Sequence, residues 1–183
     1  MLEITSDPLC THRSRSEAHF TSSAFILNSV GQPLALFHKK LKRWLQPGGH
    51  IEHADQSLLD AAWREAKEES GLELSPLSPF PIDLDIHFIP PRSTEAGHWH
   101  FDVRFAFFAP HPEKLQESDE SEGHVWLSHA KLEHWIQDHS IRRAFVGAFL
   151  LLCKAPFMEN PPTVQDILEW DQKQVEAVFG QYV

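Results

Sequence analysis

The sequence contains only two cysteines, Cys10 and Cys153, among its 183 residues. Two cysteines are too few for the disulfide framework of a small secreted domain, so we expect a cytoplasmic protein. No stretch approaches the roughly 20 consecutive apolar residues that a membrane-spanning helix needs. The longest candidate, 144–153, is short and is interrupted by Gly147. Residues 1–15 lack the apolar core of a signal peptide. We therefore expect no membrane partner.

Basic residues are also scarce. The sequence has 16 lysines and arginines against 26 aspartates and glutamates, which gives a formal net charge of −10. Such a surface repels nucleic-acid backbones, and no long basic run offsets it, so we expect no non-specific nucleic-acid binding. A small polyanionic substrate would also be repelled unless a cation mediates the contact. The length suits one domain. We expect a single domain over 1–183, with an N-terminal arm at 1–18 and a C-terminal helical extension from residue 155.

The β-forming residues and turn signals predict strands around one central helix. Two β-rich runs, 20–27 and 33–37, flank the turn-forming segment 28–32 and predict a β-hairpin. Strands are expected at 82–89 and 98–108, and the second alternates phenylalanine and valine with polar residues. The remaining predicted elements are a short strand at 125–127 and helices near 129–138, 142–153 and 163–179. This order predicts an α/β fold with a mixed sheet covered on both faces.

The central helix has clear start and stop signals. Ser57 and the residues after it have the form of a capping box, and Gly71 is a typical residue just beyond a helix end. One stripe at helical spacing is predicted to be buried and consists of Leu59, Ala62, Trp63, Ala66 and Ser70.

Three glutamates of this helix, Glu65, Glu68 and Glu69, lie at positions i, i+3 and i+4 and therefore share one face. Like charges at this spacing near the helix C-terminus cost a few tenths of a kcal/mol each. A bound Mg²⁺ or Mn²⁺ would relieve the repulsion, since these ions prefer carboxylate oxygens. A solvated acidic face is the alternative. The turn Pro47-Gly48-Gly49 favours the metal site, because glycine lets the backbone approach a metal or phosphate closely.

Residues 49–72, GHIEHADQSLLDAAWREAKEESGL, resemble the Nudix box, G-x5-E-x7-R-E-U-x-E-E-x-G-U with U aliphatic. The second half of the box matches from Arg64 to Leu72. The first half contains one extra residue. Counted from Gly49 its acidic position falls on Asp55, and counted back from Arg64 it falls on Gln56. We interpret this as an insertion before the helix, with Asp55 as the equivalent.

The resemblance implies a Nudix-like α/β/α sandwich and a divalent-metal-dependent hydrolase. Such an enzyme cleaves the diphosphate bond of a nucleoside diphosphate linked to another moiety, by attack of a metal-activated water on phosphorus. It implies Mg²⁺ or Mn²⁺ as cofactor and a small nucleotide or diphosphate as partner. By position, Glu68 and Glu69 would be metal ligands and Glu65 a ligand or the general base, with Glu65, Arg64 and Glu68 as the catalytic group. The Gly48 carbonyl and a carboxylate from a later loop would complete the metal site. For that carboxylate Glu120 has the expected spacing, with Glu122 and Asp119 as alternatives.

Two other functions fit the resemblance less well. An isoprenoid diphosphate isomerase shares the fold, but its chemistry uses a cysteine where this chain has Gly48-Gly49-His50. A silent Nudix domain that senses a nucleotide would be expected to lose the glutamates that this chain keeps.

Thirteen histidines raise the question of zinc. His50 and His53 flank the glycine turn, and His98 and His100 share a strand face, but their spacing matches no standard zinc motif, so structural or substrate-facing roles take precedence. The candidate substrate-binding residues are His100, Arg104 and, from a basic patch that precedes the turn, Arg43. For Arg104 a salt bridge is an equal alternative. The last predicted helix could cover the core or mediate a homodimer.

Overall fold

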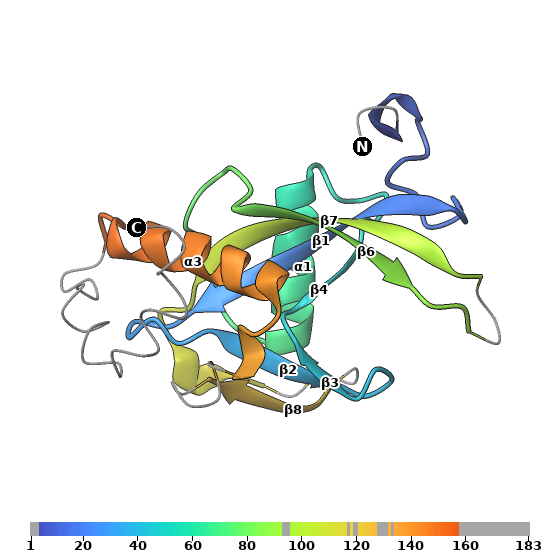
Figure 1. Cartoon of the computed structure of the whole chain (residues 1–183). Helices are drawn as coiled ribbons and strands as arrows, with labels where there is room; N and C mark the ends of the chain where they lie inside the picture. The colour runs from blue at the N-terminus through green and yellow to red at the C-terminus, as the bar shows by residue number, and fades with distance from the viewer. Residues whose placement is uncertain are drawn as a thin grey trace.

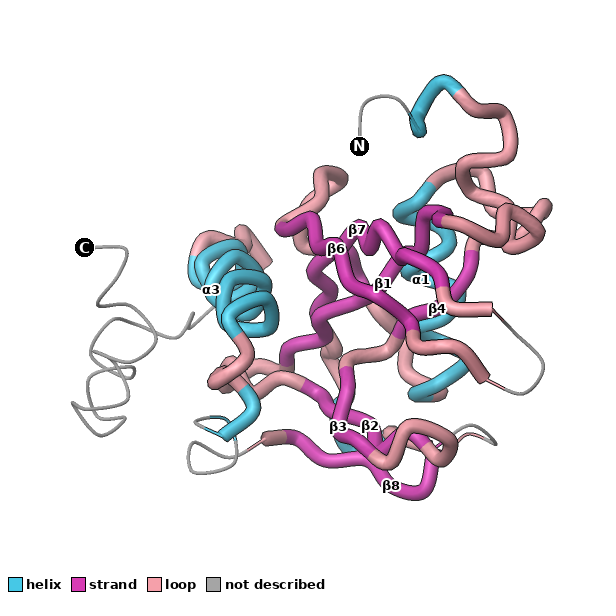
Figure 2. The backbone as a smooth tube through the Cα atoms, turned by 45° about the vertical axis from the view of Figure 1, so that its right-hand side comes forward, coloured by secondary structure: helices cyan, strands magenta, loops and turns pink. Residues whose placement is uncertain are grey.

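The structure, a computed structural model, describes residues 4–92, 96–116, 118, 121–127, 132 and 134–157. Its main elements, in chain order, are β1 (Ala18–Leu27), β2 (Leu34–His38), β3 (Arg43–Leu45), β4 (Gly48–His50), α1 (Leu58–Ser70), β5 (Ser75–Pro76), β6 (Asp83–Ile89), β7 (His98–Phe108), β8 (Ser121–Trp126) and α3 (His139–Cys153). Two short 3₁₀ helices lie at Ile4–Ser6 and Pro112–Lys114. Helices α1 and α3 lie on opposite sides of the main sheet (Figures 1 and 2), which is the expected α/β/α arrangement.

The main sheet has the strand order β4-β1-β7-β5, and β6 also pairs with β7. Strands β1 and β7 run parallel over the whole of Ala18–Leu27, whereas the other pairs are antiparallel, so the sheet is mixed as predicted. A second sheet has the order β3-β2-β8. In Figure 2 it lies below the main sheet.

The predicted hairpin of β1 and β2 is wrong. The two strands belong to different sheets and share one isolated bridge, between Leu27 and Pro33. The reason is that both edges of β1 are already paired, one with β4 and the other with β7. The strand signal in the sequence was therefore correct, but it does not specify the partner, which is a distant part of the chain.

The two faces of β1 build two separate apolar clusters, because successive side chains of a strand point to opposite faces. Ala24 and Ile26 belong to the cluster that also contains Ala62 and Ala66 of α1. Phe25 and Leu27 belong to the cluster that contains Phe145 and Phe149 of α3. The helices thus cover the sheet from both sides.

Both ends of α1 follow the sequence signals. The Ser57 side chain accepts a hydrogen bond from the backbone of Asp60, and Gly71 adopts a left-handed conformation with φ 66° and donates its N–H to the Lys67 carbonyl. The prediction for Trp63 is wrong. Its side chain is 41% exposed and lies under the Lys67 ammonium, 4.9 Å from the ring centroid. The small residues Ala62 and Ala66 face the sheet instead.

Helix α3 covers only part of its face of the main sheet. Beyond its N-terminus the same face turns polar. We call this region the polar sheet face, and its residues are His19, Thr21 and Ser23 of β1, His50 of β4, Asp83, Asp85 and His87 of β6, and His98, His100, Asp102 and Arg104 of β7. The alternation predicted for 98–108 is therefore present. Its polar side is largely covered rather than solvated, since His98, Asp102 and Arg104 are all buried.

The remaining predictions concern the chain ends. In the predicted arm the Cys10 carbonyl accepts a hydrogen bond from the backbone of Phe20, and Ile4 is buried, so residues 4–17 pack against the domain. The predicted helix at 163–179 lies outside the described residues, as do residues 129–131 and 133 of the one at 129–138. No helix in the described part of the chain has both the length and the apolar character required to cross a membrane.

Candidate diphosphate-hydrolase site

The glutamates of α1 lie against the glycines of β4. The Glu69 carboxylate is buried and accepts a hydrogen bond from the Gly48 N–H at 3.1 Å. A Cβ atom at Gly49 would lie 2.5 Å from Oε1 of Glu65, so the glycine lets this carboxylate rest against the strand. Gly49 pairs with Ser22, whose side chain bonds the Leu58 carbonyl at the start of α1. The face of β4 on which Gly49 lies is therefore the one that faces α1.

One guanidinium, that of Arg64, organises the acidic groups. Its Nε and Nη2 each lie 3.0 Å from an oxygen of Asp55, which gives a bidentate ion pair. Its Nη1 donates to Glu65 at 2.9 Å and to Glu68 at 3.2 Å. Nη2 also donates to the His50 carbonyl at 2.9 Å. Because Arg64 is held by Asp55 and the β4 backbone, it fixes the orientation of two of the three glutamates.

Asp55 completes this network, and its position shows how the loop accommodates the extra residue of the box. The Asp55 carboxylate is buried and also accepts the backbone N–H of Glu52 at 2.8 Å. Its hydrogen bonds with Arg64, and then the one from Glu52, hold the pKa of Asp55 below its usual range despite the opposing effect of burial. The pKa of Arg64 is raised in turn, first by Asp55. The inserted residue is thus absorbed by the loop, and Asp55 reaches the arginine.

This donor set suits a hard divalent cation. The Glu65 and Glu69 carboxylates lie against the glycine strand, and Arg64 holds Glu68 beside Glu65. Carboxylate and carbonyl oxygens are the ligands that Mg²⁺ and Mn²⁺ prefer. Glu65, Glu68, Glu69 and the Gly48 carbonyl are the groups that would hold such an ion.

The later acidic loop is described only in part. Glu120 and its alternative Asp119 lie outside the described residues. Glu122 forms an ion pair with Lys42 at 2.7 Å, on the second sheet. Within β8, the ring of His124 lies within hydrogen-bonding distance of the Glu69 carbonyl, at 2.9 Å. The strand that follows Glu120 therefore runs beside the C-terminal turn of α1.

The three substrate-binding candidates do not gather at the glutamates. Arg104 is buried and bonds to three aspartates, which is the salt-bridge role left open as its alternative; these partners are Asp83, Asp85 and Asp102. Its Nη1 also donates to the Ser140 carbonyl at the first turn of α3. Arg43 is exposed on β3 in the second sheet. His100 lies on the polar sheet face.

Sequence reasoning missed a cluster of histidines on that face. His19, His50 and His100 come from three neighbouring strands, and their ring nitrogens lie within 4.8 Å of one another. The rings of His98 and His87 pack against His100, at centroid distances of 4.9 and 5.5 Å. Burial, and then the four neighbouring imidazoles, lower the pKa of His100 to about 2. Only the strand register brings these residues together, so no local spacing could have revealed them.

Comparisons with known proteins agree with this architecture. Residues 18–146 match the family described as the NUDIX domain. A 59-residue stretch is 44% identical to a zebrafish (Danio rerio) protein named m7GpppN-mRNA hydrolase NUDT17, and it covers 29% of this chain and 19% of that protein. The chain thus spans about a fifth of that relative's length.

Two solved structures resemble the fold. One is a hydrolase of the NUDIX family from Clostridium perfringens, with 27% identity, a TM-score of 0.59, and coverage of 73% of this chain and 97% of that chain. The other is a C. elegans Ap4A hydrolase in a binary complex, with 19% identity, a TM-score of 0.51, and coverage of 72% and 96%.

Proposed function

We propose that this chain, which belongs to the Nudix family, is a pyrophosphohydrolase that cleaves the diphosphate bond of a nucleoside diphosphate linked to another moiety, with Mg²⁺ or Mn²⁺ as cofactor. The observation that carries this proposal is the packing of two glutamates against the glycines of β4, with Glu68 held beside them by Arg64. Glu65 contacts the position of the missing Cβ at Gly49, and Glu69 accepts the Gly48 N–H.

Such a metal ion, when bound, neutralises the diphosphate and lowers the pKa of a coordinated water, which also offsets the repulsion expected from a protein of net charge −10. The side chains would divide the remaining work. Glu68 and Glu69 supply acceptor oxygens, and the Gly48 carbonyl adds a backbone oxygen. Glu65 is the proposed general base, because a carboxylate within reach of a bound water can take its proton. Little covalent work is left for the protein beyond positioning and charge stabilisation.

Arg64 is proposed to orient the glutamate side chains rather than to contact the metal ion. Its guanidinium bonds to Glu65 and Glu68 at once, and Asp55 holds its opposite edge. The pairing keeps the two carboxylates near each other without a cation, with Glu65 largely buried and Glu68 largely exposed. We propose Glu120 as a further acidic ligand, since the strand after it runs beside the C-terminal turn of α1.

The substrate class follows in part from the relatives. One is named for hydrolysis of m7GpppN-mRNA and another for hydrolysis of Ap4A, and both names describe two nucleosides joined through a phosphate chain. We propose a small dinucleoside polyphosphate or related nucleotide as substrate. The net charge of −10 disfavours a long nucleic acid, whose many phosphates the protein would repel. Half-buried Lys39 and the exposed Lys40 and Arg43 form the basic patch that would attract a short anion.

The test is a substrate panel offered to the purified full chain with Mg²⁺ or Mn²⁺. It contains nucleoside triphosphates, ADP-ribose, diadenosine tetraphosphate, a methylated cap dinucleotide, coenzyme A and nucleotide sugars. We expect metal-dependent release of a nucleoside phosphate from at least one compound, abolished by chelation of the metal. Glu69→Gln should remove the turnover, and Glu73→Gln, an exposed glutamate outside the helix, should keep it. Absence of turnover on every compound, or equal turnover by Glu69→Gln, would refute the proposal.

The panel also separates the enzyme from a nucleotide sensor. A sensor would bind one of the compounds, measurable by calorimetry, without cleaving it. We further propose a cytoplasmic location, from the scarcity of cysteine, and a single Nudix domain with an N-terminal arm and a C-terminal extension.

A further inference from the structure

We propose that His19, His50 and His100 form a second cation site, specific for a transition metal such as Zn²⁺, on the face of the sheet opposite the glutamates. The three residues belong to β1, β4 and β7, which are adjacent in the main sheet. His19 and His100 are direct partners in the parallel pair, and His50 pairs with Thr21, two residues along β1 from His19. The strands therefore present all three rings to one point.

The distances fit a tetrahedral ion after small rotations. Zinc bound by imidazole at about 2.0–2.1 Å holds its ligand nitrogens about 3.3–3.4 Å apart. The candidate nitrogens of the three histidines already lie within 4.8 Å of one another. Each ring would need to move by about 1 Å, which a small change of side-chain torsion supplies. Among the described residues this is the group of three or more His, Cys, Asp or Glu side chains that meets this spacing.

The hydrogen bonds of the rings favour ligation. Nδ1 of His19 lies 3.1 Å from the Arg15 carbonyl, which can only accept, so this nitrogen carries the proton in the neutral ring. Nε2 of His19 then presents its lone pair, and this atom is buried. A ligand histidine held by a backbone carbonyl through its other nitrogen is the usual arrangement in metal sites, because it fixes both tautomer and ring orientation.

His98 holds the ring of His100 in place, as the Arg15 carbonyl holds the ring of His19. Nδ1 of His98 lies 2.9 Å from the Ala96 carbonyl, so its Nε2 accepts in the neutral ring. That Nε2 lies 3.0 Å from Nε2 of His100, which must then donate and leaves Nδ1 of His100 for a metal. We assign His98 as a positioning residue and the other three as ligands. Three protein ligands leave the fourth position of a tetrahedral ion to a water or a small anion.

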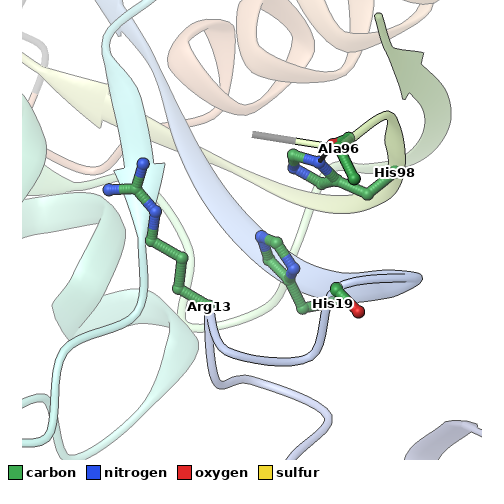
Figure 3. A pocket seen from close by; sticks show the side chains of 5 residues that line it. Arg13, His19, Ala96 and His98 are labelled. Atoms are coloured by element: carbon green, nitrogen blue, oxygen red, sulfur yellow. Dashed lines mark hydrogen bonds between the residues drawn. The ribbon is translucent and has the colours of Figure 1, made fainter. Parts of the chain in front are cut away.

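A small pocket borders the cluster on the side of His19. Its lining residues are Arg13, Ser16, His19, Ala96 and His98. Figure 3 shows the rings of His19 and His98 side by side at the end of the sheet, with the Arg13 side chain extending from the arm. This pocket lies next to one of the three proposed ligands and is lined by none of the glutamates.

The ligand types separate the two sites chemically. Imidazole nitrogen suits zinc and its neighbours in the transition series, whereas Mg²⁺ takes oxygen ligands and keeps its waters. Zinc should therefore remain at the histidines in a large excess of Mg²⁺. This difference allows the site to be tested whether or not the hydrolase proposal holds.

The experiment measures zinc in untagged, chelator-treated protein after dialysis against low zinc with millimolar Mg²⁺. We expect about one zinc per chain, with Co²⁺ in its place giving the visible absorption of a tetrahedral site. A hundredfold excess of free zinc over its Kd should raise the thermal midpoint by about 5–10 °C. His50→Ala and His100→Ala should lose the zinc. His12→Ala and His53→Ala, which remove exposed histidines, should keep it.

A second measurement covers the case in which the alanine variants do not fold. In wild-type protein labelled with ¹⁵N at histidine, zinc should shift the ring signals of His19, His50 and His100 and leave those of His12 and His111 in place. Less than a tenth of an equivalent of zinc in the wild type would overturn the proposal, as would unchanged loading in folded His50→Ala and His100→Ala. Neither readout depends on turnover, so a failure here is distinct from a failure of the substrate panel.

Discussion

The glutamate helix and the polar sheet face both gather side chains that suit a cation, but they assemble them differently. The glutamates lie within one and a half turns of α1, and helical geometry alone makes them neighbours. The histidines come from three strands and meet only because β4, β1 and β7 are paired in one register. The first cluster can be found by its spacing and the second cannot. A carboxylate site can thus be recognised from sequence while a histidine site in the same protein goes unnoticed.

Of the two regions, the polar sheet face should lose more stability when a charged side chain is removed. Arg104 is almost fully buried and compensates three aspartates, so Arg104→Leu leaves buried carboxylates uncompensated and should cost about 3–5 kcal/mol in the free energy of unfolding. Urea denaturation measures this cost. Arg143→Leu is the matched control, because Arg143 also contacts Asp83 but is 43% exposed, and it should cost about 1 kcal/mol or less. An altered KM with unchanged stability in Arg104→Leu would instead favour direct contact with substrate.

Substitution of a glutamate in α1 should lower the activity and leave the zinc content unchanged. Glu68→Gln removes one proposed ligand charge and the Arg64 contact, and we expect kcat to fall about 100- to 1,000-fold. The zinc content of this variant should equal that of the wild type, because the histidines lie on the opposite face of β4. Steady-state kinetics and metal analysis of one sample test both statements. Loss of zinc in Glu68→Gln would mean that the two clusters form one site.

The Asp55–Arg64 pair should contribute less than the buried Arg104 network. Asp55→Asn weakens a bidentate, charge-assisted contact and should lower the free energy of unfolding by about 2 kcal/mol. Glu52→Gln is its control, since the Glu52 carboxylate lies 4.0 Å from Arg64 and is 65% exposed. That change should alter stability by less than about 0.5 kcal/mol. Equal effects of the two substitutions would contradict the assignment of Asp55 as the acidic partner.

The smallest effect is the pH dependence of the same pair. The pKa of Asp55 in the folded protein lies below its usual value of 3.8, so the folded state binds its proton less readily than the unfolded state. The stabilisation is therefore complete above that usual value and declines as the pH falls through the lower, folded value. The difference in unfolding free energy between wild type and Asp55→Asn should stay constant from about pH 7 to pH 5 and shrink below about pH 4. A difference that grows on acidification would exclude this origin.

The parts of the fold that could be predicted are those with local causes. Ser57 and Gly71 mark the ends of α1, and the alternation of 98–108 marks β7. The pairing of β1 with β7 could not be predicted, since it joins segments about eighty residues apart and no local signal distinguishes it from the hairpin. The predicted burial of Trp63 was wrong for a related reason. Its spacing fits the buried stripe, but the helix approaches the sheet through alanines, which leaves a large ring at the edge.

Of the candidate site, the sequence identified the glutamates, the arginine and the glycine turn, because all belong to one motif. It left Arg104 open between a substrate contact and a salt bridge, because the choice depends on three aspartates from two strands. It could not identify the convergence of His19 with His50 and His100. Such features need the register of the sheet before they become visible.

His50 connects the two clusters. Its ring belongs to the histidine cluster on one face of β4, and its carbonyl accepts Nη2 of Arg64, which orients the glutamates on the other. Any coupling between ions bound at the two clusters would pass through this residue, and such linkage is reciprocal. Whatever factor zinc introduces into the affinity for Mg²⁺, Mg²⁺ must introduce into the affinity for zinc. The supply of one metal would then set how fully the protein is loaded with the other.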